Sequence, residues 1–243
     1  MYLCISKTII TQGSFIGCFY NKERTKDMKN VVLIGATGFV GSAILSELLN
    51  RGHHVTAVVR NTSKLPQHDN LTAVKEDVSD VDALAAIAKG KDAIISAYNP
   101  GWTNPNIAKD TVVNYQKIIA ATKKSGVERL LIVGGAGTLF VAPGLRALET
   151  DGFPAEIMNG VISLGYVYLN ILTNENDIDW VFFSPAGEFD TDGPRTGKFR
   201  LGKDDMLFDA NGKSHISVKD YAVAMVDELE KPTHHMERFT IGY

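Results

Sequence analysis

Hydrophobic residues along the chain gather in short runs that alternate with longer amphipathic stretches. Short apolar runs bounded by turn residues are typical of strands that helices cover on both faces. The amphipathic stretches between them, such as residues 107–124 and 155–174, predict helices. Repeated strand–helix units predict a parallel sheet with right-handed crossovers. The pattern therefore predicts an α/β fold, a Rossmann-like doubly wound sheet whose strands include residues 31–34, 55–59, 71–75, 93–97, 130–133 and 180–183.

Three glycines follow the first predicted strand at a spacing of three residues: Gly35, Gly38 and Gly41. Gly35 permits a sharp turn off the strand, Gly38 lets backbone N–H groups approach a pyrophosphate, and Gly41 lets the next helix pack close to the sheet. The positive end of that helix suits the pyrophosphate. Because a strand precedes the glycines and a helix follows them, a dinucleotide site is favoured over a glycine-rich turn without a ligand.

The second predicted strand ends at Arg60, where a site for NAD usually carries an acidic residue that binds the ribose hydroxyls. A guanidinium can instead bind a 2′-phosphate through two parallel hydrogen bonds. We therefore expect NADP(H) to be preferred, with NAD(H) as the second choice, unless Arg60 is merely solvated. Asp77, after the third strand, lies where it could meet the adenine amino group or serve only as a loop carboxylate.

The two ends of the chain differ from its middle. Residues 1–27 combine a broken apolar pattern with a charged run, which predicts a disordered N-terminal extension outside a single NAD(P)-binding Rossmann domain of residues 28–243. From residue 188 the chain becomes polar and glycine-rich, and we expect a small C-terminal excursion over the cofactor cleft. Its basic residues Arg195 and Lys198 either meet an anionic substrate or a phosphate, or form a solvated turn.

The composition of the chain limits the kinds of binding partner and the cellular location that we expect. The chain is 44% hydrophobic and 22% charged with a net charge of −3, which is ordinary for a globular protein and argues against nucleic acid as a partner. No run of 18 apolar residues occurs, so no membrane span is expected. Cys4 and Cys18 both precede residue 28, which favours a cytoplasmic domain without disulfides. The neighbouring pairs at residues 53–54 and 234–235 lack the spacing of metal ligands, and we expect these histidines at the surface.

With these motifs assembled, residues 29–243 resemble the atypical short-chain dehydrogenase/reductase superfamily, and within it the small NAD(P)H-binding branch that includes NADH-flavin reductase-like proteins. The resemblance lies in residues 35–41, 60–61, 76–78, 193–198 and 216–222. It implies that the cofactor is bound by Gly35, Thr37, Gly38, Phe39 and Val40 at the pyrophosphate, Arg60 at the adenosine phosphate, Asp77 and Val78 at the adenine, and Ala97, Tyr98 and Pro185 at the nicotinamide.

The chain departs from that superfamily in its catalytic residues. Epimerases and alcohol dehydrogenases of the superfamily use Tyr-x-x-x-Lys, because an ammonium one helical turn away lowers the pKa of the phenol. No tyrosine here has lysine at the fourth following position, and Tyr166 is followed there by Asn170. Glycines occupy the positions after the fifth strand where a serine is expected. The catalytic residue is therefore open, with Tyr98 and Tyr166 as candidates.

Hydride transfer to a conjugated ring needs little proton help from the protein, because the reduced ring spreads its charge. The sequence therefore favours an NAD(P)H-dependent oxidoreductase that transfers hydride to a small flavin- or quinone-like acceptor, held against the nicotinamide in a dry cleft. A non-catalytic NADP(H)-sensing regulatory protein is the alternative, and an NAD-dependent epimerase or dehydratase is a third. The protein is expected to be a monomer or a homodimer.

Overall fold

The computed structural model describes residues 28–243 and contains an eight-stranded sheet. The strands run parallel except β10, which pairs antiparallel with β12. The strand order reverses between β1 and β4, which is the switch point of a doubly wound sheet, and the predicted fold class is confirmed. In spatial order the strands are β10 (Arg200–Gly202), β12 (Glu237–Gly242), β8 (Asp179–Ser184), β5 (Arg129–Val133), β4 (Ala93–Ser96), β1 (Asn30–Ile34), β2 (His54–Val59) and β3 (Leu71–Lys75).

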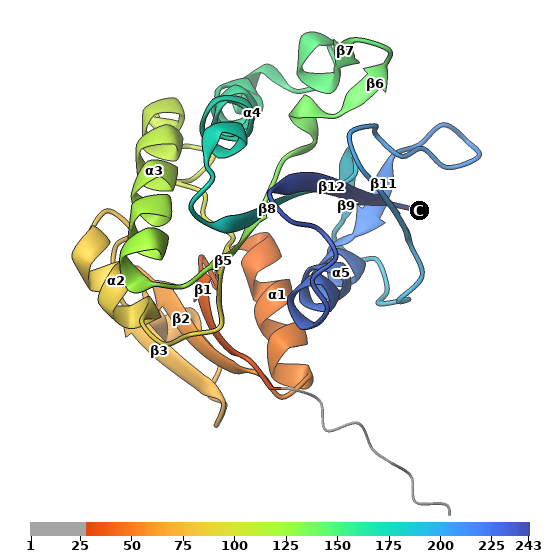
Figure 1. The fold of residues 1–243 in the computed structure, drawn as a ribbon. Helices are drawn as coiled ribbons and strands as arrows, with labels where there is room; N and C mark the ends of the chain where they lie inside the picture. Colours follow the sequence, from red (N-terminus) through yellow and green to blue (C-terminus); the bar gives the residue numbers. More distant parts are fainter. Residues whose placement is uncertain (1–27) are drawn as a thin grey trace, which may run out of the picture.

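Helices cover both faces of this sheet (Figure 1). One face carries α1 (Phe39–Asn50) and α5 (Val218–Glu230), and the other carries α2 (Val81–Ala88), α3 (Ile107–Ser125) and α4 (Ala155–Tyr166). Alternate residues of β1 enter opposite cores, Val31 and Leu33 on the α1 side and Val32 on the α3 side. This alternation explains why the central strands are apolar at every position.

Local sequence sets several of the helix ends. The Asp80 side chain accepts a hydrogen bond from the backbone N–H of Ala83 and caps α2, and Ser217 caps α5 by accepting from the N–H of Asp220. Gly126 ends α3 with a φ of 77°, a left-handed conformation that favours glycine. These signals act over a few residues, so they can be recognised without tertiary information.

Short elements between residues 134 and 217 escaped prediction. They are the hairpin of β6 (Phe140–Ala142) and β7 (Leu145–Arg146), the parallel pair β9 (Glu188–Asp190) and β11 (His215–Ser217), and several 3₁₀ turns. Strands of two or three residues carry no period that sequence analysis could detect. The extension predicted for residues 1–27 lies outside the described residues, and the domain division stays a prediction.

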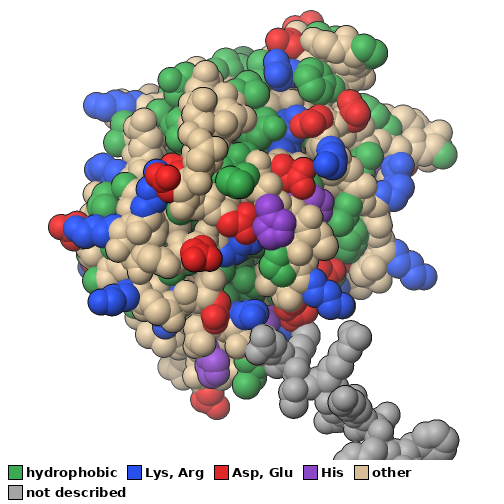
Figure 2. Space-filling model, in the orientation of Figure 1, with side chains coloured by type: hydrophobic (Ala, Val, Ile, Leu, Met, Phe, Trp, Pro, Cys, Tyr) green, Lys and Arg blue, Asp and Glu red, His purple; other side chains and the backbone are tan. Residues whose placement is uncertain are grey.

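The helix that starts with α4 continues through a π-helical turn at Val167–Ile171 and a 3₁₀ turn at Leu172–Asn174. In the described part of the chain, the helical stretch Ala155–Asn174 is long and apolar enough to cross a membrane by length and composition, with a mean hydropathy of 1.2. A mostly buried core helix passes the same test, whereas 28% of this stretch is buried, and it packs against α3. On the face shown in Figure 2, acidic and basic side chains are interspersed.

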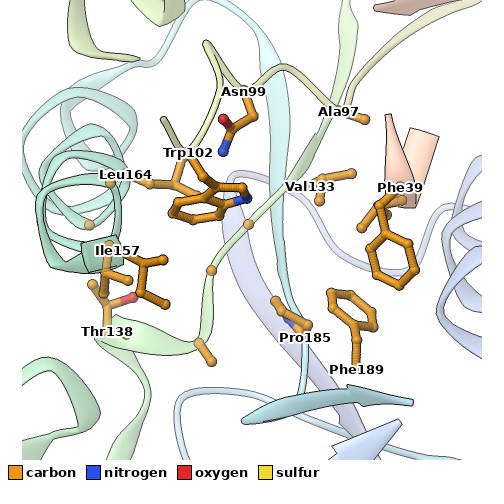
Figure 3. Close-up of a pocket in the computed structure, with 18 of the residues that line it drawn as sticks. Phe39, Ala97, Asn99, Trp102, Val133, Thr138, Ile157, Leu164, Pro185 and Phe189 are labelled. Atoms are coloured by element: carbon orange, nitrogen blue, oxygen red, sulfur yellow. The ribbon is translucent and has the colours of Figure 1, made fainter. Parts of the chain in front are cut away.

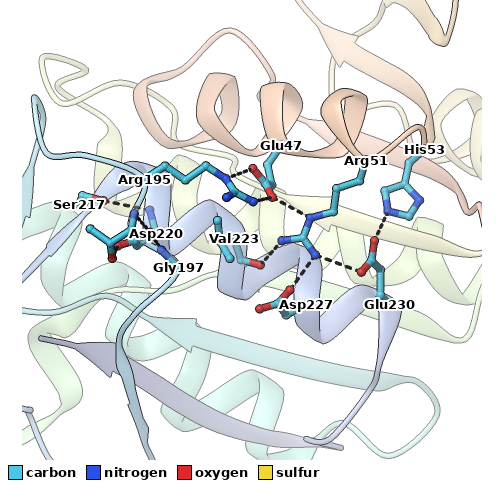
Figure 4. A network of polar contacts seen from close by, with 11 residues as sticks. Glu47, Arg51, His53, Arg195, Gly197, Ser217, Asp220, Val223, Asp227 and Glu230 are labelled. Carbon is cyan, nitrogen blue, oxygen red and sulfur yellow. Dashed lines mark hydrogen bonds and ion pairs between the residues drawn. The ribbon is translucent and has the colours of Figure 1, made fainter. Parts of the chain in front are cut away.

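The polar excursion is fastened to the helices of the sheet by carboxylates (Figure 4). Arg195 donates two hydrogen bonds to Glu47 of α1, at 2.8 and 2.6 Å. Asp220 of α5 accepts hydrogen bonds from the backbone N–H groups of Thr196 and Gly197, both at 2.8 Å. The idea that Arg195 meets an anionic substrate is therefore wrong, because its guanidinium is engaged on the middle of α1. The excursion reaches the cleft described below through Phe189.

A second arginine, Arg51, joins α1 to α5 by donating to Asp227 and Glu230. Nearby, His53 is fully buried, accepts from the backbone N–H of Lys29 at its Nδ1, and places Nε2 3.0 Å from Glu230. The prediction that His53 is a surface residue is therefore wrong. Adjacent residues at the start of a strand point to opposite sides, and His53 takes the inner side while His54 stays exposed.

Candidate functional site

Two cavities open at the carboxyl ends of the central strands. The polar cavity, about 450 Å³, is lined mainly by residues after β1, β2, β3 and β4. The apolar cavity, about 350 Å³, lies beside it, between the ends of β4, β5 and β8 and helix α4. Both are lined by Gly38, Ala97, Tyr98 and Asn99, so one elongated ligand can pass from the first to the second.

The glycine turn between β1 and α1 forms the boundary of both cavities. Gly35 has a φ of 79°, and a Cβ atom there would lie 2.5 Å from the carbonyl oxygen of Ala97. A Cβ atom at position 41 would lie 2.1 Å from the carbonyl oxygen of Gly35. A side chain fits neither position without moving backbone, so the close approach expected from the sequence is present.

The polar cavity brings together the residues expected at an adenosine phosphate and an adenine. Arg60 lines it, together with Asp77 and Val78. Hydrogen bonding from the backbone N–H of Ser79, at 2.8 Å, lowers the pKa of the Asp77 carboxyl below its usual value, so this side chain is a carboxylate at neutral pH. Lys64, which sequence analysis missed, also lines the cavity at the end of a 3₁₀ turn that Asn61 caps.

The apolar cavity differs in chemistry. Among the described residues that line it, none is Asp, Glu, Lys, Arg or His. Figure 3 shows Trp102, Ile157 and Leu164 on one side of it, with Phe39 and Phe189 on the other. Its side chains that can form hydrogen bonds are Tyr98, Asn99, Trp102 and Thr138. Such a cavity favours a planar, uncharged group with few polar atoms.

Glycines shape the wall of the apolar cavity. A Cβ atom at Gly134 would lie 2.7 Å from the Phe182 ring, and one at Gly160 would lie 2.6 Å from the indole of Trp102. The indole therefore packs directly on the backbone of α4, although Trp102 remains 52% exposed. After β5, Gly134 thus packs against Phe182, whereas a Cβ at Gly135 would meet only Leu164 Cδ2, at 3.3 Å, where the backbone borders the apolar cavity.

Tyr98 stands where the two cavities meet. Its phenolic oxygen accepts a hydrogen bond from Asn114 Nδ2 at 2.6 Å, and its ring packs edge-on against Tyr115. Burial raises the pKa of the Tyr98 phenol above its usual value, and the hydrogen bond from Asn114 and the charge of Arg60 offset this only in part. Tyr98 therefore stays protonated, and it contributes its ring and a neutral hydroxyl group to the lining of both cavities.

The other catalytic candidate, Tyr166, is not at the site. Its side chain is 49% exposed, and it lines neither cavity. The reason lies in helix geometry: Leu164 and Gly165 of the same helix face the apolar cavity, and Tyr166 follows on the outer side of α4. The proposed catalytic role of Tyr166 is therefore withdrawn.

All residues expected to bind cofactor line one or both cavities. Thr37, Gly38 and Val40 surround the glycine turn, and Pro185 lies in the apolar cavity at the end of β8. The glycine cradle, where a Cβ would fill the turn, and the polar cavity beside it suit a dinucleotide. In the described part of the chain, no group of three or more His, Cys, Asp or Glu side chains could hold a metal ion.

Comparison with known proteins agrees with this arrangement. Residues 35–232 match the family model described as NAD(P)H-binding. A solved structure from Bacteroides thetaiotaomicron, proposed to be an epimerase, is 55% identical with a TM-score of 0.84, and the match covers 89% of this chain and 97% of that chain.

Two further solved structures are similar over nearly their whole length. A protein from Burkholderia pseudomallei, proposed to be exported, is 38% identical with a TM-score of 0.78, covering 89% of this chain and 100% of that chain. A protein from Streptococcus pneumoniae, proposed to be an NADH-flavin reductase, is 32% identical with a TM-score of 0.76, covering 88% of this chain and 99% of that chain.

Proposed function

Because the chain belongs to the NAD(P)H-binding family, we propose that it is an NADPH-dependent oxidoreductase that transfers hydride to a flavin- or quinone-like acceptor. The observation that carries this proposal is the apolar cavity, which continues from the polar cavity and has no charged side chain in its described lining. A planar conjugated ring can bury there beside a nicotinamide. Exclusion of water then favours hydride transfer over side reactions.

NADPH is proposed as the preferred cofactor. Arg60 and Lys64 both line the polar cavity, and both can pair with the 2′-phosphate that distinguishes NADPH from NADH. The carboxylate of Asp77 is held by Ser79 in a tight turn beside them. It is therefore proposed to meet the adenine amino group, as the sequence implied, and not the phosphate.

Epimerase chemistry on a sugar is disfavoured even though one solved relative is proposed to be an epimerase. Sugar hydroxyls lose hydrogen bonds to water on binding, and a site that selects them must replace those bonds. The described lining of the apolar cavity offers only Tyr98, Asn99, Thr138 and the indole N–H of Trp102 for this purpose. Tyr98 also lacks a lysine partner that could activate it.

Oxidation of NADPH by the purified protein tests the proposal. Flavins, quinones and aldehydes are each added in turn, and the expected result is turnover with a flavin or quinone and little with simple aldehydes. Tight binding of NADPH with no turnover of any acceptor would contradict the proposal and favour the non-catalytic sensor. We also propose a cytoplasmic monomer or homodimer, which cell fractionation and light scattering test.

A further inference from the structure

A buried arginine lies behind the wall of the apolar cavity, on the face of the sheet that carries α4. Thr138 lines the cavity, is 1% exposed, and accepts a hydrogen bond at its Oγ1 from Arg238 Nη1 at 2.7 Å. Arg238 lies on β12, and 100 positions separate the two residues in sequence. The function proposed above makes no use of this contact.

The contacts of Arg238 hold its positively charged guanidinium in the interior of the protein, next to Thr138. The Nε edge of the guanidinium donates to Asp204 at 3.0 Å, while the opposite Nη1 faces Thr138. The Arg238 side chain is 3% exposed and Asp204 is 53% exposed. The guanidinium also lies over the Tyr168 ring, 4.6 Å from its centroid. The ion pair is therefore oriented, with the cation next to the cavity wall and the carboxylate toward solvent.

The direction of the Arg238–Thr138 hydrogen bond is fixed by chemistry. A guanidinium has five N–H donors and no acceptor, so the hydroxyl oxygen of Thr138 is the acceptor and its hydrogen is left to donate elsewhere. A cation bound to the oxygen polarises that O–H group and strengthens it as a donor. The methyl group of Thr138 lies 3.0 Å from the position that a Cβ of Gly165 would occupy, so packing against α4 limits rotation of the side chain.

We propose that the Thr138 hydroxyl, polarised by Arg238, donates a hydrogen bond to a carbonyl oxygen of the acceptor and stabilises the negative charge that forms there. This inference rests on the proposed function and narrows its substrate to a conjugated carbonyl compound such as a quinone. The acceptor gains a hydride, with its two electrons, at one end of the conjugated system, while NADPH is oxidised to NADP⁺. The π electrons move to the oxygen, which then takes a proton from water.

Thr138 and Arg238 would thus supply what the missing Tyr-x-x-x-Lys supplies in related enzymes, a hydroxyl next to a fixed cation. Arg238 is a positioning residue, since it acts through Thr138. The hydroxyl of threonine is too weak an acid to give up its proton, so its role is to stabilise an anion and not to protonate it. Oxyanion stabilisation of this kind is worth about 10² to 10³ in rate.

Binding of 4-nitrophenolate, an analogue of the charged product, tests the inference without turnover. Calorimetry at a pH where the ligand is ionised compares the unmodified protein with Thr138→Val and Thr138→Ser. The valine variant keeps the shape and is expected to bind about 10- to 150-fold more weakly, the range for a hydrogen bond to a charged group. The serine variant should bind like the unmodified protein. Equal binding by the valine variant would overturn the inference.

A double-mutant cycle with Arg238→Gln tests the positioning role. If Arg238 acts through Thr138, the two substitutions together should weaken 4-nitrophenolate binding no more than Thr138→Val alone. Additive losses would contradict that role.

Kinetics separates this inference from the proposed function. Thr138→Val should lower kcat with a quinone by about 10² to 10³ and leave the KM for NADPH unchanged. A valine variant as fast as the unmodified enzyme would refute the inference and leave the function intact. Absence of turnover in the unmodified protein would refute the function, whereas the 4-nitrophenolate measurement would still decide whether Thr138 binds an oxyanion.

Discussion

The carbonyl oxygen of Gly35 lies 2.1 Å from the place where residue 41 would carry a Cβ atom. Both partners are backbone, so neither can rotate away. Gly41→Ala should therefore shift the start of α1, and overpacking of this kind costs about 1 to 3 kcal/mol, which corresponds to a loss of roughly 2 to 12 °C in Tm. Ser46→Ala, at an exposed position of the same helix, is the control for thermal unfolding. A Gly41→Ala variant with unchanged Tm would show that this contact is not required.

Arg60→Ala should weaken NADPH binding by roughly 10- to 150-fold, because a hydrogen bond to a charged phosphate contributes about 1.5 to 3 kcal/mol. NADH binding should change little, since NADH lacks the phosphate. Calorimetric titration with both cofactors measures the effect, and Lys64→Ala tests the second cation of the polar cavity. If the unmodified protein binds NADH as tightly as NADPH, the assignment of Arg60 fails.

Gly135→Val should abolish turnover while NADPH still binds. A Cβ at Gly135 would lie 3.3 Å from Leu164 Cδ2, which is tight but tolerable, and the two further methyl groups of valine would occupy the apolar cavity. Steady-state kinetics and NADPH titration of the same preparation separate the two effects. Full activity with a quinone would mean that the acceptor does not use this space.

Tyr166→Phe should leave kcat within about two-fold of the unmodified enzyme, because the phenol lies outside both cavities. Loss of a working general acid would instead cost about 10² to 10⁴ in rate. A drop of that size in a variant that still binds NADPH would restore Tyr166 as a catalytic candidate.

The fold should lose stability in acid through Glu47. Its hydrogen bond with Arg195 is the main reason that the pKa of this carboxyl is lowered from 4.5. A lowered pKa in the folded state means that the stabilisation is complete above 4.5 and is lost as the pH falls from 4.5 through the folded-state value. Arg195→Gln should therefore lower Tm at neutral pH and flatten its decline below 4.5. Lys213→Gln, at an exposed position, is the control. An unchanged pH profile of Tm in Arg195→Gln would contradict this.

The sequence predicts structural features that depend only on residues close together in the chain. The turn from Gly35 to Gly41 and the caps at Asp80 and Ser217 each depend on a few neighbouring residues, and so they were foreseeable. The pairing of Arg195 with Glu47 could not be predicted, because 148 positions separate the two residues. A basic turn has the same sequence pattern whether it binds a ligand or a helix of the same protein.

The hydroxyl of Thr138 escaped notice for a similar reason. Its polarising cation, Arg238, is brought to it by the order of strands in the sheet and by no local motif. Lys64 left only a weak local signal, a second cation four positions after Arg60. The prediction for Tyr166 failed because α4 carries apolar residues on both sides, so the sequence pattern does not show which side of the helix faces the interior.

The packing of Trp102 on Gly160 also gives the protein an optical reporter. The chain has two tryptophans, and they stand in contrasting surroundings: Trp102 is 52% exposed at the apolar cavity and Trp180 is 3% exposed in the core. Indole fluorescence shifts to longer wavelength in water and is quenched by a stacked conjugated ring. The long-wavelength part of the emission therefore reports acceptor binding without a label, and the short-wavelength part from Trp180 provides an internal reference.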